Sequence, residues 1–210
     1  MTKLDKQIIY RAAKVLADIL FLALSLACII FTNTAMAETI KVKMDTNKGS
    51  VIIELYPEKA PETVKNFLHY VNEGKYNNTV FHRVVKGFVN QGGGYNHDYK
   101  LVDTFGPVKN EADNGLKNLR GTIAMARKND PDSARNQFFI NTADNKILDH
   151  KDKTPAGWGY CVFGEIVEGM NVMDRISKVR TRGFGPFAAD APLSPVSIRS
   201  IVVIKAEEKN

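Results

Sequence analysis

The sequence has 210 residues, of which 44% are hydrophobic and 25% are charged, as expected for a globular protein with one well-formed core. Its net charge is +6, but no basic run with interleaved aromatic residues occurs, so we expect no nucleic-acid partner. The first 37 residues hold four basic and two acidic side chains, which leaves only a mild positive excess on the rest of the chain.

Residues 1–37 have the three-part pattern of a secretory signal peptide. A basic amino-terminal region precedes an apolar stretch at residues 19–31, which is too short to span a bilayer. Ala35-Met36-Ala37 then fits a cleavage site of the A-x-A type. We therefore expect a mature chain of one domain, residues 38–210, located in the periplasm or secreted.

An uncleaved membrane anchor that begins near Val15 is the alternative. Asp18 and the polar residues 32–34 interrupt such a helix and favour cleavage, after which we expect no stable membrane association. Cys28 is not followed by the polar tether of a lipoprotein, and cleavage would remove it. Cys161 would then be the single cysteine, without a disulfide partner, and its apolar neighbours predict a buried and unreactive thiol.

The mature chain is expected to open with a hairpin of two strands, residues 39–46 and 50–55, joined at Asn47-Lys48-Gly49. Pro61 suits the first position of a helix. The apolar residues that follow recur at i, i+3, i+4 and i+7, which predicts one buried helix face made of Val64, Phe67, Leu68 and Val71. Gly74 ends this helix.

A strand rich in β-branched and aromatic residues follows at 79–85 and contains Arg83. Gly87 interrupts the pattern, and we interpret it as a bulge that brings Phe88 onto the face of Arg83. Gln91 comes next, followed by three glycines, 92–94, which would let another backbone approach closely. A planar cation, an apolar ring and an amide side by side suit the binding of a neutral peptide; an ordinary surface arginine is the alternative.

The rest of the chain predicts short strands separated by irregular segments. Residues 96–119 form a long polar excursion, a short helix is expected at 170–179, and 181–195 is interpreted as a loop. Further strands are predicted at 121–127, 136–141, 160–167 and 196–205. Seven or eight strands and two helices without βαβ alternation predict a mainly β fold, an antiparallel sheet closed into a barrel whose open ends the helices cover.

Several chemistries find no support in the sequence. No G-x-S-x-G motif occurs, no lysine follows the glycine run as in a phosphate-binding loop, and the carboxylates are scattered. None of the histidines has metal-ligand spacing to another histidine or cysteine; they are His69, His82, His97 and His150. We therefore expect no metal and no cofactor, and a groove with one arginine and no nucleophile.

Three motifs in the same order resemble the cyclophilins, a family of peptidyl-prolyl cis-trans isomerases. They are Phe81-His82-Arg83-Val84-Val85 with Phe88-Val89-Asn90-Gln91-Gly92-Gly93, then Gly121-Thr122-Ile123-Ala124-Met125-Ala126, then Asn136-Gln137-Phe138-Phe139-Ile140. The similarity runs from about residue 40 to 204. Asn110-Glu111-Ala112-Asp113-Asn114-Gly115 and Ala143-Asp144-Asn145 are similar to the periplasmic bacterial branch, in agreement with the signal peptide.

The resemblance implies a closed eight-stranded antiparallel barrel capped by two helices, with a substrate groove on its outer surface. It implies that Arg83 is catalytic and that a pocket takes the substrate proline ring. The residues that match the pocket are Phe88, Val89, Phe139 and Leu148. Gln91 and Gln137 match amides that position the peptide, and the backbone at Ala126 and Arg127 matches a segment that pairs with the substrate main chain. The other implied substrate-binding residues are His82, Ile147 and Tyr160.

The sequence departs from the best-known eukaryotic pattern at four of these positions. Val89 stands where methionine is usual, Arg127 where asparagine is usual, and Tyr160 where many members have histidine. Ile147 replaces a tryptophan that in the family contacts the rim of bound cyclosporin. These differences bear on drug affinity and sequence preference more than on catalysis.

The implied reaction is rotation about the X-Pro bond of a proline-containing polypeptide, in an unfolded or extended segment of an exported protein. No bond breaks, so no covalent intermediate is needed. A non-catalytic proline-peptide binding module or chaperone on the same scaffold is the alternative, and Arg83 distinguishes the two because a pure binder would not need it. A hydrolase is a third hypothesis, but the sequence offers no candidate nucleophile for it. We expect a monomer.

Overall fold

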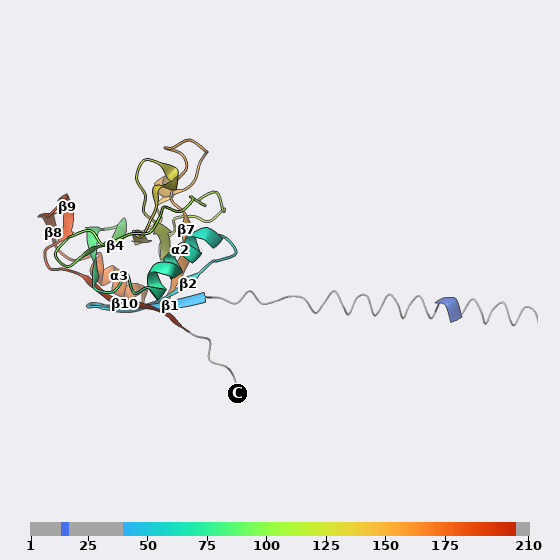
Figure 1. Cartoon of the computed structure of the whole chain (residues 1–210), viewed down its shortest axis with the longest axis horizontal. Coiled ribbons are helices and arrows are strands. Elements are labelled where there is room, and N and C mark those ends of the chain that lie inside the picture. The colour runs from blue at the N-terminus through green and yellow to red at the C-terminus, as the bar shows by residue number, and fades with distance from the viewer. Residues whose placement is uncertain (1–13, 17–39, 205–210) are drawn as a thin grey trace, which may run out of the picture. The chain divides into compact units, whose positions relative to one another are not determined.

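The structure is a computed structural model that describes residues 14–16 and 40–204 (Figure 1). Residues 14–16 are helical, and the rest of the predicted signal peptide, with its cleavage site, lies outside the described residues. The chain divides into two compact units, residues 1–38 and 39–210. No helix among the described residues is long and apolar enough to cross a membrane.

All further elements belong to the second unit. Its strands are β1 (Ile40–Thr46), β2 (Gly49–Leu55), β3 (Thr79–Val85), β4 (Val89–Asn96), β5 (Thr122–Met125), β6 (Phe138–Asn141), β7 (Val162–Glu168), β8 (Thr181–Phe184), β9 (Phe187–Pro192) and β10 (Ser197–Ile204). Its helices are α2 (Pro61–Asn72) and α3 (Met170–Ile176), with short 3-10 helices η1 (Pro131–Ser133) and η2 (Lys146–Leu148).

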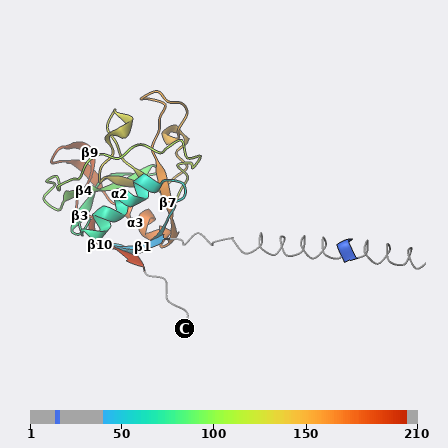
Figure 2. The same cartoon turned by 45° about the vertical axis from the view of Figure 1, so that its right-hand side comes forward.

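Eight of the strands close into an antiparallel barrel in the order β1-β10-β3-β4-β6-β5-β7-β2, which confirms the predicted fold class. Closure pairs every barrel strand on both sides and leaves no long exposed edge. Helix α2 runs across the barrel (Figure 2). The buried faces of α2 and α3 join the barrel core through Val64, Phe67 and Val71 of α2 and Val172, Met173 and Ile176 of α3.

The interior of the barrel is filled with aromatic side chains. The Phe67 ring of α2 lies 5.2 Å from the Tyr76 ring, 5.8 Å from that of Phe138 and 5.2 Å from that of Phe163, measured between centroids. All four side chains are at most 1% exposed. Tilted and edge-to-face pairs at these distances add to the stabilisation from apolar burial. Because this core leaves no room for a peptide, a binding site has to lie on the outside of the barrel.

The amino terminus of α2 depends on a residue far away in the sequence. Ala60 precedes the helix and offers no side-chain cap. The Glu111 carboxylate instead accepts the backbone N–H groups of Glu62 and Thr63 at 3.2 and 2.9 Å, and the Thr63 hydroxyl at 2.7 Å. A carboxylate at this end also interacts favourably with the helix dipole. The polar excursion at 96–119 therefore contributes directly to the start of α2.

Of two predictions about the glycines around the Arg83 strand, one was wrong and the other is confirmed at two of three positions. Gly87 does not form a bulge: it has φ +71° and lies in the three-residue loop between β3 and β4, where the Phe88 N–H donates to the Val85 carbonyl at 3.0 Å. Glycines 92–94 lie inside β4. At Gly92 and Gly93 a backbone carbonyl oxygen, of Val80 and Asn136 respectively, comes within 3.1 Å of the position of an added Cβ, as predicted. At Gly94 the Gln137 side chain occupies that space instead.

The predicted loop at 181–195 was also wrong, because its larger part forms the two-stranded hairpin β8–β9. Strand β9 contacts β3 of the barrel. The Phe187 ring of β9 stacks on the His82 imidazole of β3 with centroids 5.2 Å apart, and lies 5.0 Å from the Tyr95 ring of β4. Packing against the barrel thus fixes a segment whose glycine, alanine and proline content suggests irregular structure.

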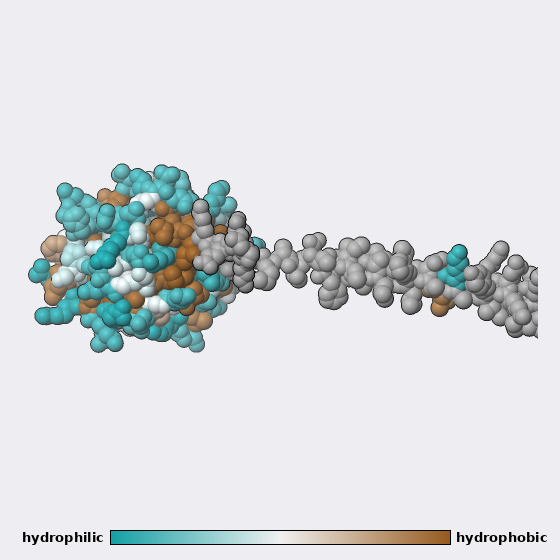
Figure 3. Space-filling model, turned by 90° about the horizontal axis from the view of Figure 1, so that it is seen from below, coloured by the Kyte–Doolittle hydropathy of each residue, from teal (hydrophilic) through white to brown (hydrophobic). Residues whose placement is uncertain are grey.

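Apolar residues also gather on one outer face of the domain, seen from below in Figure 3. Three consecutive residues at the end of β10 are exposed at 39–49%: Val202, Val203 and Ile204. Residues 205–210 follow directly and lie outside the described part of the chain.

Candidate active site

The register of the barrel places five residues of five strands in one row. Arg83 of β3 pairs with Gln91 of β4, which pairs with Phe139 of β6; Phe139 pairs with Ala124 of β5, and Ala124 with Val162 of β7. Residues directly opposite each other in neighbouring strands point to the same side of a sheet. Phe139, Ala124 and Val162 belong to an apolar cluster separate from the barrel core, so this row lies on the outer face.

The outer cluster contains all four residues that the resemblance assigned to a proline pocket. Its buried members are Val89, Ala124, Phe139 and Val162, and its partly buried members are Phe88, Leu116, Ala126, Leu148 and Tyr160. The Phe139 and Tyr160 rings meet edge to face with centroids 5.6 Å apart. The structure thus brings together four residues from three segments that the resemblance assigned to one pocket, and it adds Leu116 from the polar excursion.

Polar side chains continue the row at the edge of this cluster. Arg83 Nη1 lies 3.5 Å from Gln91 Oε1, and Gln91 Nε2 donates to Gln137 Oε1 at 3.0 Å. The Arg83 side chain is 36% exposed, so its guanidinium can meet a ligand at the surface. A cation, two amides and an apolar cluster therefore form one continuous surface.

Arg127 has a role that sequence reasoning missed. Its guanidinium donates to the carbonyls of Lys128 and Asn129 beside it at 2.9 and 3.2 Å, and to those of Pro155 and Gly159 on a distant loop at 3.1 and 2.8 Å. It also lies 4.9 Å from the centre of the Tyr160 ring. These hydrogen bonds use four of the five N–H donors of the side chain. The two that reach Pro155 and Gly159 connect the loop 151–159 to the end of β5.

Three further residues that the resemblance assigned to substrate binding, Ala126, Ile147 and His82, each have a different environment. The Ala126 N–H donates to the Gln137 carbonyl at 2.9 Å and is not free for a peptide. Ile147 of η2 is 73% exposed, at the rim beside Leu148. His82 is only 1% exposed and lies under Phe187. Burial lowers the pKa of His82 to about 4, and hydrogen bonding to the Val80 backbone and the Gln137 side chain offsets only part of this effect.

A set of buried asparagines supports the pocket from behind, and the sequence analysis assigned it no such role. Asn145 Nδ2 donates to the Phe88 carbonyl at 3.0 Å and to Asn141 Oδ1 at 2.7 Å. Asn141 Nδ2 donates to Asn118 Oδ1 at 3.1 Å, and Asn118 Nδ2 donates to the Leu148 carbonyl at 3.1 Å. This network connects the backbones that carry two pocket residues. Asn145 lies in the Ala143-Asp144-Asn145 motif, but the sequence of that motif does not indicate which groups its side chain hydrogen-bonds.

A hollow of about 450 Å³ adjoins the polar end of the site. It is lined by Gln91, Tyr95, Leu101, Val102, Thr104, Ala126, Arg127, Lys128, Ser133, Arg135, Asn136 and Gln137. Two of these residues, Gln91 and Gln137, also belong to the polar edge beside Arg83. Ala126 lines the hollow and also belongs to the outer apolar cluster, so the hollow adjoins both the polar edge and the cluster.

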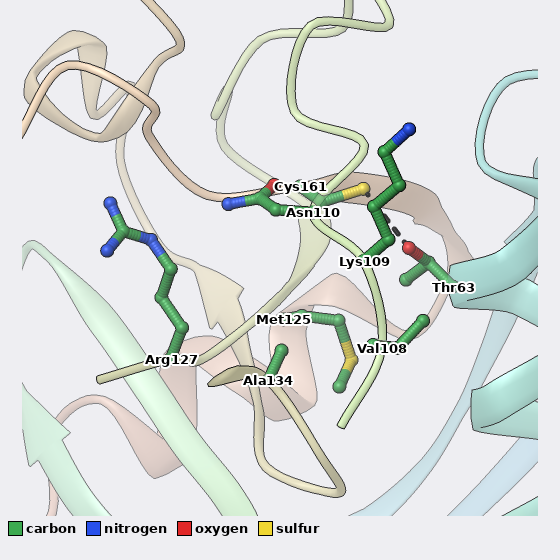
Figure 4. A pocket seen from close by; sticks show the side chains of 8 residues that line it. All are labelled: Thr63, Val108, Lys109, Asn110, Met125, Arg127, Ala134 and Cys161. Atoms are coloured by element: carbon green, nitrogen blue, oxygen red, sulfur yellow. Dashed lines mark hydrogen bonds between the residues drawn. The ribbon is translucent and has the colours of Figure 1, made fainter. Parts of the chain in front are cut away.

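A second void, near Cys161, is too small for a substrate (Figure 4). Its volume is about 10 Å³, roughly the space of one water molecule. The Cys161 Sγ lies 3.4 Å from the Thr63 hydroxyl, and burial raises the pKa of the thiol to about 12. Cys161 is free and buried, as the sequence predicted, and a thiol with this pKa is not a nucleophile at neutral pH.

The protein is a closed antiparallel barrel that carries an apolar cluster, an arginine and two amides on its outer face, and comparison with known proteins gives its family. The family model for cyclophilin-type peptidyl-prolyl cis-trans isomerases matches residues 41–203. The chain therefore belongs to the cyclophilin-type peptidyl-prolyl cis-trans isomerases, which confirms the resemblance.

Curated relatives agree with this family. The chain is 52% identical over 164 residues to peptidyl-prolyl cis-trans isomerase A of Dickeya dadantii, covering 78% of this chain and 84% of the relative. It is also 52% identical over 162 residues to peptidyl-prolyl cis-trans isomerase B of Escherichia coli, covering 77% and 98%. These relatives are bacterial.

Solved structures show the same fold. The crystal structure of a cyclophilin-type peptidyl-prolyl cis-trans isomerase of Cryptosporidium parvum is similar with a TM-score of 0.64 and 26% identity, covering 80% of this chain and 99% of that one. A second structure of that protein, in the presence of the dipeptide Ala-Pro, is similar with a TM-score of 0.63.

Proposed function

We propose that Arg83 is the catalytic residue of this isomerase and that the outer cluster around Phe139 binds the substrate proline ring. The observation that carries the proposal is the register row, which sets Arg83, Gln91 and Phe139 side by side on three adjacent strands. Cis–trans exchange in an X-Pro peptide, measured by NMR with and without the protein, tests it. An unchanged exchange rate would overturn the proposed function.

The proposed mechanism uses no covalent step. The C–N bond of an X-Pro peptide resists rotation by about 18–20 kcal/mol because of its partial double-bond character. With the proline ring held by the cluster, the preceding carbonyl turns about the C–N axis, and the nitrogen becomes pyramidal and gains a lone pair. The Arg83 guanidinium donates to this nitrogen or to the rotating oxygen. Such a donor stabilises the twisted state more than either planar state, which is what lowers the barrier.

The substrates we propose are unfolded or extended proline-containing segments of exported proteins. The Cryptosporidium relative was crystallised in the presence of Ala-Pro, which supports a proline-containing ligand for this fold. The basic start, short apolar stretch and Ala35-Met36-Ala37 motif support export and a periplasmic location. Under this proposal the enzyme assists folding there, because uncatalysed X-Pro exchange takes tens to hundreds of seconds.

If the protein is exported, its mature form should begin at a defined amino terminus. We expect the protein recovered from the periplasmic fraction of the producing cell to lack residues 1–37 and to begin at Glu38, because signal peptidase cleaves after an A-x-A site. Intact-mass measurement of the fractionated protein checks this. A product that keeps residues 1–37 and remains with the membrane would contradict the prediction.

Weak inhibition by cyclosporin-type drugs is expected because of Ile147. Its exposed side chain offers less surface than the family's tryptophan and has no indole N–H donor. Loss of one such contact costs about 1–3 kcal/mol, or roughly tenfold or more in affinity. Ile147→Trp should tighten inhibition and leave peptide turnover nearly unchanged. Inhibition constants for both proteins test this, and low-nanomolar inhibition of the unaltered protein would contradict it.

A further inference from the structure

The Arg83 guanidinium is contacted from two sides by different parts of the chain. On one side Gln91 Oε1 of β4 lies 3.5 Å from Nη1. On the other, Asp190 Oδ2 of β9 lies 3.8 Å from Nε. Nη2 donates no hydrogen bond within residues 40–204. The Asp190 contact is an ion pair longer than a hydrogen bond, so the guanidinium is contacted at Nε and Nη1 by two different strands.

The hairpin that carries Asp190 is held firmly against the barrel. Besides the packing of Phe187 on His82 and Tyr95, the Tyr99 hydroxyl donates to the Pro192 carbonyl at 3.3 Å. The Tyr99 ring also meets the Phe184 ring edge to face at 5.0 Å. The residue after Asp190, Ala191, is fully buried. The carboxylate therefore sits on an anchored strand and not on a loose loop.

The backbone at Asp190 is in an uncommon conformation. Its φ is +65°, a region that is costly for most residues other than glycine and that asparagine and aspartate tolerate best. This local turn of the strand coincides with the register shift between β8 and β9. It occurs at the residue whose carboxylate meets Arg83.

We propose that Asp190 is a positioning residue for Arg83: it holds the guanidinium through Nε so that the Nη groups face the twisted peptide bond. This inference rests on the proposed catalytic role of Arg83. An arginine on an open groove would otherwise sample several rotamers, and a donor acts best when it is already oriented before the reaction. Asp190 and Arg83 are both about one-third exposed, so the pair stabilises the fold only slightly.

Two substitutions at Asp190 distinguish the effect of its carboxylate on turnover from the effect of its backbone conformation. Asp190→Asn keeps the shape and the tolerance of positive φ but removes the charge, and Asp190→Gly removes the side chain while easing the backbone. Asp174→Asn is the matched control, because it removes a carboxylate that pairs with Arg120 at 2.8 Å instead of with Arg83. Both Asp190 variants should lower kcat about three- to fivefold with KM within about twofold, and Asp174→Asn should leave kcat unchanged.

Two further measurements report on the contact itself. The Arg83 Nε–Hε signal in NMR spectra should shift in Asp190→Asn and stay in place in Asp174→Asn. In an Arg83→Lys background, which has no Nε, Asp190→Asn should have no further effect on kcat. A purely structural role of Asp190 would lower turnover equally in both backgrounds and would overturn the proposal.

The remaining outcomes are also decisive. If Asp190→Asn and Asp190→Gly both keep the kcat of the unaltered protein while Arg83→Ala loses turnover, Arg83 is catalytic and the positioning role is refuted. If only Asp190→Gly is impaired, the backbone conformation and not the carboxylate matters, and the proposal is again refuted. If Arg83→Ala itself keeps turnover, the proposed function fails, independently of Asp190.

Discussion

Arg83→Ala is expected to lower turnover of an X-Pro peptide by a factor of about 10²–10³, the usual effect of removing one preorganised donor. Peptide affinity should fall far less than turnover, because the variant keeps the apolar cluster with Phe88, Phe139 and Leu148, which we propose holds the proline ring. Exchange rates measured by NMR and peptide affinities measured by calorimetry, on the unaltered protein and the variant, test both statements.

The variant should fold, because the Arg83 side chain is partly exposed and belongs to neither apolar cluster. Circular dichroism and the unfolding midpoint are the controls. Arg83→Lys should restore only part of the turnover, since an ammonium group lacks the planar arrangement of guanidinium donors. A folded Arg83→Ala protein with turnover within a few-fold of the unaltered protein would refute the catalytic role and favour a proline-peptide binding module or chaperone.

His82 is expected to make the domain less stable in mild acid. Its pKa lies near 4 in the folded state against 6.5 when exposed, so between these values the unfolded chain binds the proton more readily. Stability is therefore complete above pH 6.5 and falls as the pH drops toward 4. The loss approaches about 3 kcal/mol in the free energy of unfolding. Urea unfolding at pH 7, 6 and 5 measures it.

The window from pH 6.5 to 5 isolates this effect. The Arg120 guanidinium lowers the pKa of Asp174, so that pair loses its contribution only in more acidic solution. His82→Phe keeps an aromatic ring against Phe187 and removes the titration, so its stability should change less between pH 7 and 5. His97→Gln, at an exposed histidine, is the matched control. An equal pH dependence in His82→Phe and the unaltered protein would contradict the role of His82.

Much of the barrel could be predicted because local patterns agree with it. The alternation in 39–55 and its turn match the pairing of Met44 with Val51 and of Val42 with Ile53, all of which are buried. The apolar spacing of the first helix predicted the buried Val64, Phe67 and Val71. In such segments each residue's preference for strand or helix and its burial in the fold point the same way.

The segment 181–195 could not be predicted in the same way. Its strands β8 and β9 are mostly exposed, so they lack the alternation of apolar and polar residues that marks a half-buried strand. Aromatic contacts with β3 and β4 hold the hairpin, and Asp190 gains a function only through its distance from Arg83. Neither relation is visible in the order of the residues.

The sequence by itself determined the alternating strands and the first helix, because these segments are contiguous and their spacing reflects burial. It also contains the three motifs whose resemblance gave the family and the candidate site residues. Only the tertiary structure decided what Arg127, His82 and Asp190 do. Their partners are a distant loop, an aromatic ring of the hairpin and the catalytic arginine proposed here, respectively. Contacts between residues far apart in the chain depend on how the strands pack. The type of a charged or polar residue does not indicate which distant residue it will contact.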